Sequence, residues 1–327
     1  MRSISVLASS LLAFSAHSAE VTPYIVNGTD ISASSYPDFV SLFYDRINYD
    51  GLYGKGPYCG GTLLDEQHVL TAAHCIYGDS NYQLFTSVVP QLQNESDFPN
   101  SVQQRVMVNE YYYPSTYNDS TLYDDIAIVK LASPITAVNT YVALADDSER
   151  GTYRQTSEDF YAVGHGNTES NYDSTKELQR TKLKWVDNTT CDANYTTDAS
   201  ENLCMDGAAT VTYDNATCQG DSGGPLYWNG KQVGITSFGP QTCGNPAVTA
   251  NSVFTEVALT KHKDWINSVL SGNEAPIVTV TDAQRNTALG ITTPTDSGGG
   301  GGSLGIFVLS ALGLLGWRRR LNSSNFK

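Results

Sequence analysis

The sequence predicts an all-β fold, a barrel or a sandwich, that ends in one helix. Most of residues 25–272 consists of short apolar runs separated by Gly, Pro, Asn and Asp, which is the pattern of strands joined by turns. The clearest strand candidates are 69–73, 126–131, 160–163 and 232–238. Only 261–270 has the apolar spacing of a helix. Its apolar positions are Trp265, Ile266, Val269 and Leu270.

The composition is that of a globular protein with a sizeable core. The 327 residues are 40 % hydrophobic and 10 % aromatic, which allows one large domain or two small ones. The formal net charge is −15, from 34 acidic and 19 basic residues, and this charge disfavours nucleic acid as a partner. We expect a monomer without a cofactor.

The N-terminus has the pattern of a secretory signal peptide. Arg2 supplies a positive charge, 6–14 is largely apolar, and small residues follow at Ala16 and Ser18. We expect a signal peptide at 1–18, with cleavage one residue later as an alternative and a buried N-terminal helix as the competing interpretation. Export would place the six cysteines in an oxidising compartment, where an even number indicates up to three disulfides.

The C-terminus resembles a bacterial Gly-Gly sorting tail. The segment S-G-G-G-G-G-S at 297–303 precedes an apolar run at 304–317 and three arginines at 318–320. These arginines mark the cytoplasmic side of a membrane by the positive-inside rule. The resemblance implies a transmembrane sorting tail at 298–320, with a processing protease and the secretion machinery as partners. The exported body would be released or anchored at the cell surface; a buried core helix is the alternative.

Three segments carry the residue types of nucleophilic catalysis. Ser222 lies in G-D-S-G-G-P at 220–225, where glycines let the backbone approach a ligand closely. A serine hydroxyl becomes a nucleophile when a base takes its proton, and His74 in T-A-A-H-C could be that base. The histidine in turn needs a carboxylate to orient it, which Asp125 at the start of a strand could supply. Each residue alone could be a turn, a structural histidine or a cap. Their joint occurrence predicts a Ser-His-Asp triad.

With these motifs the chain resembles the trypsin and chymotrypsin family of serine endopeptidases. Further matches are I-V-N-G at 25–28, C-G-G-T-L at 59–63, V-G-H-G at 163–166 with His165 in place of Trp, and S-F-G at 237–239. The resemblance covers 25–272 and implies two six-stranded antiparallel β-barrels with the active site between them. Residues 273–297 are then expected to be a linker, with one candidate strand at 277–280.

The resemblance implies roles for the motif residues. Ser222 would attack the scissile carbonyl, His74 would act as base and then acid, and Asp125 would orient His74. The backbone N–H groups of Gly220 and Ser222 would form the oxyanion hole. The product of the first step is an acyl-enzyme, so peptides or proteins are the expected substrates.

All six cysteines have a counterpart in the family pattern. Sequence alone allows fifteen pairings. The resemblance implies the pairs Cys59 with Cys75, Cys191 with Cys204, and Cys218 with Cys243.

The resemblance also implies a zymogen that is cleaved before Ile25. The new α-ammonium of Ile25 would pair with Asp221, which lies beside the nucleophile, and residues 19–24 would be a short propeptide. Tyr24 stands where the family usually has a basic residue, so the activating protease must accept an aromatic residue. A second copy of this enzyme is one candidate for that activator.

The pocket positions predict a neutral specificity site. Ala216 stands where trypsin-like members carry Asp, and Thr217 and Gly239 are expected to line an open pocket that Ser252 shortens. Ser237 and Phe238 belong to the same expected wall. We therefore expect chymotrypsin- or elastase-like cleavage after aromatic or medium apolar residues, with trypsin-like specificity through Asp214 as the alternative.

Two other features of the sequence bear on function. A non-catalytic binding module on the same fold would be displayed at the surface, but all three triad residue types are present. The acidic patch at 94–97 could hold Ca²⁺, yet it lacks EF-hand spacing, so a solvated turn and no metal site are expected. The expected location is outside a bacterial cell.

Overall fold

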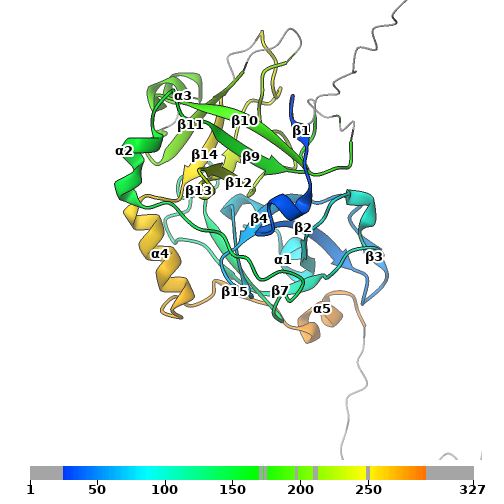
Figure 1. Ribbon diagram of the computed structural model, residues 1–327. Helices are drawn as coiled ribbons and strands as arrows, with labels where there is room; N and C mark the ends of the chain where they lie inside the picture. The colour runs from blue at the N-terminus through cyan, green and yellow to red at the C-terminus, as the bar shows by residue number, and fades with distance from the viewer. Residues whose placement is uncertain are drawn as a thin grey trace, which may run out of the picture. The chain divides into compact units, whose positions relative to one another are not determined.

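Two closed antiparallel β-barrels make up the fold, which confirms the expected architecture (Figure 1). The computed structural model describes residues 25–168, 172, 175–195, 198–208, 213–247 and 251–291. All elements below belong to the unit that ends at Leu289. The expected signal peptide (1–18), propeptide (19–24) and sorting tail (298–320) lie outside the described residues.

The first barrel is built from the N-terminal half of the chain. Its six strands are β2 (Phe39–Arg46), β4 (Cys59–Leu63), β5 (His68–Thr71), β6 (Thr86–Pro90), β7 (Val106–Tyr112) and β8 (Ala127–Leu131). Neighbouring strands follow the order β7-β6-β2-β4-β5-β8, and β7 also pairs with β8, which closes the barrel. The short β3 (Leu52–Tyr53) pairs with β2.

The second barrel repeats this arrangement. Its strands are β9 (Phe160–Gly164), β10 (Gln179–Val186), β11 (Asn202–Gly207), β12 (Pro225–Trp228), β13 (Lys231–Phe238) and β14 (Ser252–Glu256). The order β10-β11-β14-β13-β12-β9 is closed by pairing of β9 with β10. The short β1 (Thr29–Asp30) extends this sheet beside β10, so the chain enters the second barrel before it forms the first.

Buried aliphatic and aromatic side chains fill each barrel, because strands that close into a small barrel turn one face wholly inward. Close strand packing in the first barrel requires a glycine on β4. A Cβ on Gly61 would lie 2.7 Å from Val69 Cγ1 and 2.9 Å from Leu70 O. Any larger residue there would push β4 away from β5.

Helices are short and lie between or after the strands. The α-helices are α1 (Ser80–Phe85), α2 (Arg150–Tyr153), α3 (Asn188–Tyr195), α4 (Thr260–Leu270) and α5 (Asp282–Ala288). The 3₁₀ turns are η1 (Ala33–Ser35), η2 (Ala73–Cys75), η3 (Glu95–Asp97) and η4 (Asp147–Glu149). The terminal helix expected at 261–270 is α4, which buries Ile266 and Val269 as the spacing predicted.

The chain after α4 returns to the first barrel, where a linker was expected. Val278 of β15 (Val278–Thr279) pairs with Tyr111 on β7, and α5 follows below the barrel (Figure 1). Arg285 on α5 is only 2 % exposed and donates to the carbonyl oxygens of Leu84 and Val108 at 2.6 and 2.5 Å. This part of the segment packs on the domain instead of spanning freely. The candidate strand at 277–280 is β15, whereas the packing of α5 was not expected, because arginine is usually a surface residue.

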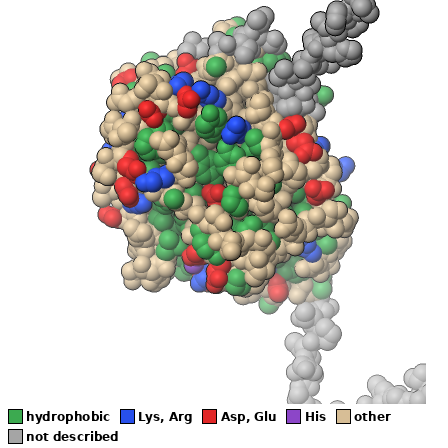
Figure 2. Space-filling model, in the orientation of Figure 1, with side chains coloured by type: hydrophobic (Ala, Val, Ile, Leu, Met, Phe, Trp, Pro, Cys, Tyr) green, Lys and Arg blue, Asp and Glu red, His purple; other side chains and the backbone are tan. Residues whose placement is uncertain are grey.

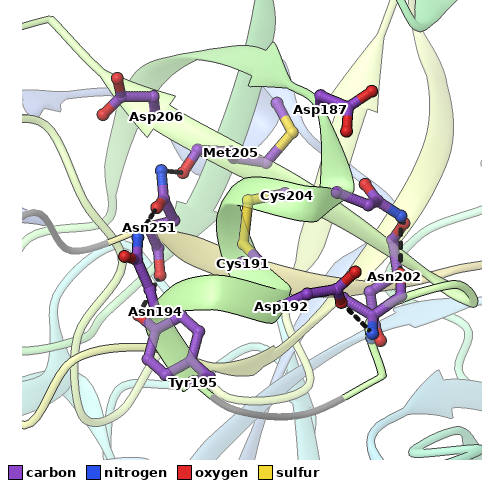
Figure 3. The surroundings of a disulfide bond; sticks show 12 residues. Asp187, Cys191, Asp192, Asn194, Tyr195, Asn202, Cys204, Met205, Asp206 and Asn251 are labelled. Atoms are coloured by element: carbon purple, nitrogen blue, oxygen red, sulfur yellow. Dashed lines mark hydrogen bonds between the residues drawn. A yellow bond between two sulfur atoms is a disulfide. The ribbon is translucent and has the colours of Figure 1, made fainter.

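All three disulfides join the pairs that the family resemblance implied. Cys191 on α3 is bonded to Cys204 on β11, and Figure 3 shows polar contacts on both sides of this bond. Asp192 accepts a hydrogen bond from Ala199 N at 2.7 Å. Asn194 donates to Asn251 Oδ1 at 2.8 Å, so the disulfide and these bonds together fix α3 against the sheet.

Charged side chains are interspersed on the face drawn in Figure 2, with acidic and basic groups close to one another. Local ion pairs among the described residues include Lys182 with Asp159 at 2.6 Å and Lys231 with Glu149 at 2.8 Å. In the described part of the chain, no helix has both the length and the apolar character needed to cross a membrane.

Candidate active site

His74 and Asp125 meet because their strands are neighbours. His74 lies in η2, directly after β5, and Asp125 lies two residues before β8, which pairs with β5. Asp125 Oδ2 is 2.7 Å from His74 Nδ1, and Asp125 Oδ1 accepts the His74 backbone N–H at 2.9 Å. Asp125 is fully buried, so this carboxylate holds both the ring and the main chain of the histidine.

Two residues of the second barrel complete the surroundings of Asp125. Ser237 Oγ donates to Asp125 Oδ2 at 2.5 Å, and Thr255 Oγ1 donates to the Asp125 carbonyl at 2.9 Å. Ser237 was expected only as pocket wall, and Thr255 was not singled out, since no local pattern marks either as a partner of a distant acid. These bonds tie the acid of one barrel to strands of the other.

The contacts define the state of the His74 ring. A carboxylate can only accept hydrogen bonds, so Nδ1 carries the proton and a neutral ring leaves Nε2 as acceptor. Burial alone would lower the pKa of His74, but the charge and hydrogen bond of Asp125 outweigh burial and raise it. The ring is therefore prepared to take up a proton at Nε2.

The turn that carries Ser222 lies where the two barrels touch. Gly60 N on β4 donates to the Ser222 carbonyl at 2.8 Å. Gly223 has a left-handed backbone (φ 75°), and a Cβ there would lie 2.2 Å from Thr71 Oγ1. The glycine therefore lets the serine turn press against the end of β5, the strand that leads to His74.

Asp221 occupies a closed cradle behind Ser222. It is 1 % exposed, and its carboxylate accepts the N–H groups of Gly166 and Cys218 at 2.8 and 2.9 Å. A Cβ on Gly166 would lie 2.3 Å from the Asp221 carboxyl carbon. Gly220, the expected oxyanion residue, has φ 103°, a conformation that favours glycine.

The segment I-V-N-G packs beneath the same region. Ile25 and Val26 are fully buried, and Val26 O accepts the Ala216 N–H at 3.3 Å. Asn27 also has a left-handed backbone (φ 62°), and its amide donates to Asn215 Oδ1 at 2.5 Å. The start of the described chain is thus joined to the residues just before the serine turn.

A cavity of about 170 Å³ opens beside Ser222. Thr217, Ser237, Phe238 and Gly239 line it as expected, and no described lining residue carries a charge. Ala216 and Ser252 do not line it. Ala216 is buried in an apolar cluster, and Ser252 Oγ accepts the Thr217 N–H at 3.0 Å, so Ser252 supports the pocket wall instead of shortening the cavity.

The patch at 94–97 forms the short turn η3. Asn94 caps it by accepting the Ser96 N–H at 2.9 Å. Glu95 is buried and pairs with Lys176 at 2.9 Å, so a lysine ammonium already supplies a cation to the buried carboxylate.

His165, the residue in place of the family tryptophan, is buried beside the serine turn. Its Nε2 is 3.2 Å from the Leu92 carbonyl, and its ring lies 6.1 Å from that of Phe39. Burial lowers the pKa of His165 to about 4. The folded protein therefore keeps this histidine neutral under conditions in which an unfolded chain would protonate it.

This difference predicts acid sensitivity. As pH falls from about 6.5 to 4, the unfolded state gains a proton at residue 165 that the folded state does not, so stability falls through this window and levels off below it. Lowering the pH from 7.5 to 4.5 should reduce the free energy of unfolding by ~2.5 kcal/mol through His165. His165→Gln keeps a donor but does not titrate, so urea unfolding at both pH values should show a smaller acid loss. An equal loss in both proteins would contradict the role of His165.

Comparison with known proteins identifies relatives of this chain. The family model described as Trypsin matches residues 25–266. Chymotrypsin-like elastase family member 1 from Canis lupus familiaris is 30 % identical over 262 residues, covering 78 % of this chain and 95 % of the relative. The same protein from Felis catus is 32 % identical over 263 residues (78 % and 92 %). Trypsin, alkaline C from Manduca sexta is 30 % identical over 249 residues (75 % and 90 %). These relatives come from animals.

Proposed function

Because the chain belongs to the trypsin family and is a serine endopeptidase, we propose that Ser222, His74 and Asp125 are its catalytic triad. The observation that carries this proposal is the contact of 2.7 Å between His74 Nδ1 and a fully buried Asp125. It leaves Nε2 of His74 as the base, at the junction where the Ser222 turn meets the first barrel.

The residues would act in two steps. His74 Nε2 takes the proton of Ser222 as Oγ bonds to the scissile carbonyl carbon, and then gives it to the leaving amine, which departs from an acyl-enzyme. Water then attacks the ester by the same route, and Ser222 regains its proton. The N–H groups of Gly220 and Ser222 would stabilise the negative oxygen in both steps.

Labelling by a fluorophosphonate tests the nucleophile. We expect one covalent adduct, on Ser222, and its formation should require the unprotonated His74 ring. Because the probe needs an activated serine, a folded protein that takes no label would instead support a non-catalytic binding module on this fold.

For specificity we propose cleavage after aromatic or medium apolar residues. The support is the uncharged lining of the cavity of about 170 Å³ and the open wall at Gly239. A panel of peptide anilides that differ only in the residue before the cleaved bond should favour Leu or Phe over Arg by at least about tenfold in kcat/KM. Preference for Arg would support the alternative role of Asp214.

We further propose that the protein is exported and made as a zymogen. Three disulfides are typical of proteins that fold outside the reducing cytosol. Ile25 is buried, and its neighbour Val26 bonds to Ala216 just before the serine turn, which fits release of a new N-terminus there. Cleavage would follow Tyr24, and the Gly-rich C-terminal segment would act as a bacterial-type sorting tail. N-terminal sequencing and intact mass of the secreted form should give Ile25 as the first residue and a mass that lacks the tail.

A further inference from the structure

Asp124, the residue before the proposed triad acid, has an unusual backbone that its side chain holds in place. Its φ is 52°, in the left-handed region that non-glycine residues rarely adopt. The side chain is 6 % exposed and has three partners: Thr116 Oγ1 at 2.5 Å, Lys261 Nζ at 2.5 Å and His262 Nε2 at 3.0 Å. These contacts fix the turn from which Asp125 points toward His74.

His262 has acceptors on both ring nitrogens. It lies on α4 and is 2 % exposed. Nδ1 is 2.6 Å from the Glu256 carbonyl oxygen, and Nε2 is 3.0 Å from Asp124 Oδ1. A neutral imidazole has one N–H and would aim a lone pair at one of these oxygens. The geometry therefore requires N–H groups on both nitrogens, which is the imidazolium form.

The imidazolium form also balances the nearby charges. Asp124 and Glu201 are both paired with Lys261, so one ammonium serves two carboxylates, and the imidazolium supplies the second positive charge. The Glu256 carboxylate is itself paired with Arg150 and Arg154. Burial would raise the pKa of Asp124, but its bonds to His262, Lys261 and Thr116 lower it. The other titratable groups of this region are Tyr112, Tyr113, Tyr123 and Glu274.

We propose that His262, as a buried imidazolium, is a positioning residue for catalysis: through Asp124 it holds Asp125 in register with His74. The inference rests on the proposed function of the triad. A side chain at 262 that cannot donate to both oxygens would loosen the turn at Asp124 and shift Asp125. The expected consequence is a lower kcat with little change in KM, because His262 lies outside the substrate cavity.

Asp124→Asn gives the sharpest test, because it keeps the shape and removes the charge. The asparagine Oδ1 can accept from Thr116 while Nδ2 donates to a neutral His262 ring, so the need for an imidazolium disappears. Lys261 loses its acceptor on residue 124 and keeps its ion pair with Glu201. Long-range ¹H–¹⁵N spectra of the whole enzyme, with His262→Gln for assignment, should show both His262 nitrogens protonated at pH 7.5 in the wild type and a neutral ring in Asp124→Asn. A neutral His262 in the wild type at this pH would overturn the proposal.

Kinetics separate positioning from mere stability. His262→Gln should lower kcat about tenfold with KM changed less than about twofold, because the Asp125 carboxylate shifts while the substrate cavity does not. His68→Gln is the matched control, because His68 also pairs with an aspartate, Asp65 at 2.7 Å, but lies on β5 and has no contact with Asp124. An unchanged kcat in His262→Gln would refute the inference alone. If Ser222 takes no fluorophosphonate in the wild type, the triad proposal itself fails.

Discussion

Replacing Ser222 with alanine is expected to lower kcat/KM by about 10⁴- to 10⁶-fold, a range taken from other serine proteases. The loss is large because no other group can form the acyl-enzyme, while His74 and Asp125 keep their contact at 2.7 Å. Hydrolysis of the best anilide of the panel, followed at enzyme concentrations high enough to detect the residual rate, measures the change.

The folded state of this variant can be verified independently of activity. The main-chain bond from Gly60 N to the Ser222 carbonyl does not involve the hydroxyl, so thermal unfolding should match the wild type closely. A Ser222→Ala protein with near-normal turnover would show that another residue is the nucleophile.

Asp221→Asn is expected to lower kcat/KM by about 10²- to 10³-fold, the range for loss of an oxyanion hole. The Asp221 carboxylate accepts the N–H groups of Gly166 and Cys218, and Gly166 lies so close that a Cβ there would clash with it. An amide in its place removes the negative charge proposed to bind the Ile25 ammonium and turns one acceptor into a donor. Gly220, between Cys218 and Ser222, would then lose its fixed orientation.

Asp206→Asn serves as the control for Asp221→Asn, because Asp206 is an exposed residue on β11 of the same barrel. It should keep full activity after the same processing. N-terminal sequencing must show Ile25 in all samples, so that failed cleavage is not mistaken for a failed site. Full activity of Asp221→Asn with Ile25 at its N-terminus would contradict the proposed activation mechanism.

Apolar patterns along the chain predicted the helix and the strand that such patterns produce. The spacing of Ile266 and Val269 predicted α4, and the apolar run at 126–131 predicted β8. The family motifs placed His74, Asp125 and Ser222 and implied the three disulfides. Each of these signals lies within a few consecutive residues or in a motif of the trypsin and chymotrypsin family.

Contacts between distant polar residues were not predictable in the same way. Ser237 and Asp125 are 112 residues apart, and His262 and Asp124 are 138 apart. Arg285 packs under a barrel strand that lies 177 residues earlier. Serine, histidine and arginine are common on surfaces, so composition gives no sign that these particular side chains are buried.

By itself the sequence determined the β-rich fold, the terminal helix and the residue types of a serine protease site. Only the tertiary structure decided which polar groups are buried against one another. These are Ser237 and Thr255 around Asp125, His262 beside Asp124, and Arg285 beneath the first barrel. The physical reason is that a buried polar group must find a partner, and the partner is chosen by how the strands close, not by the neighbouring sequence.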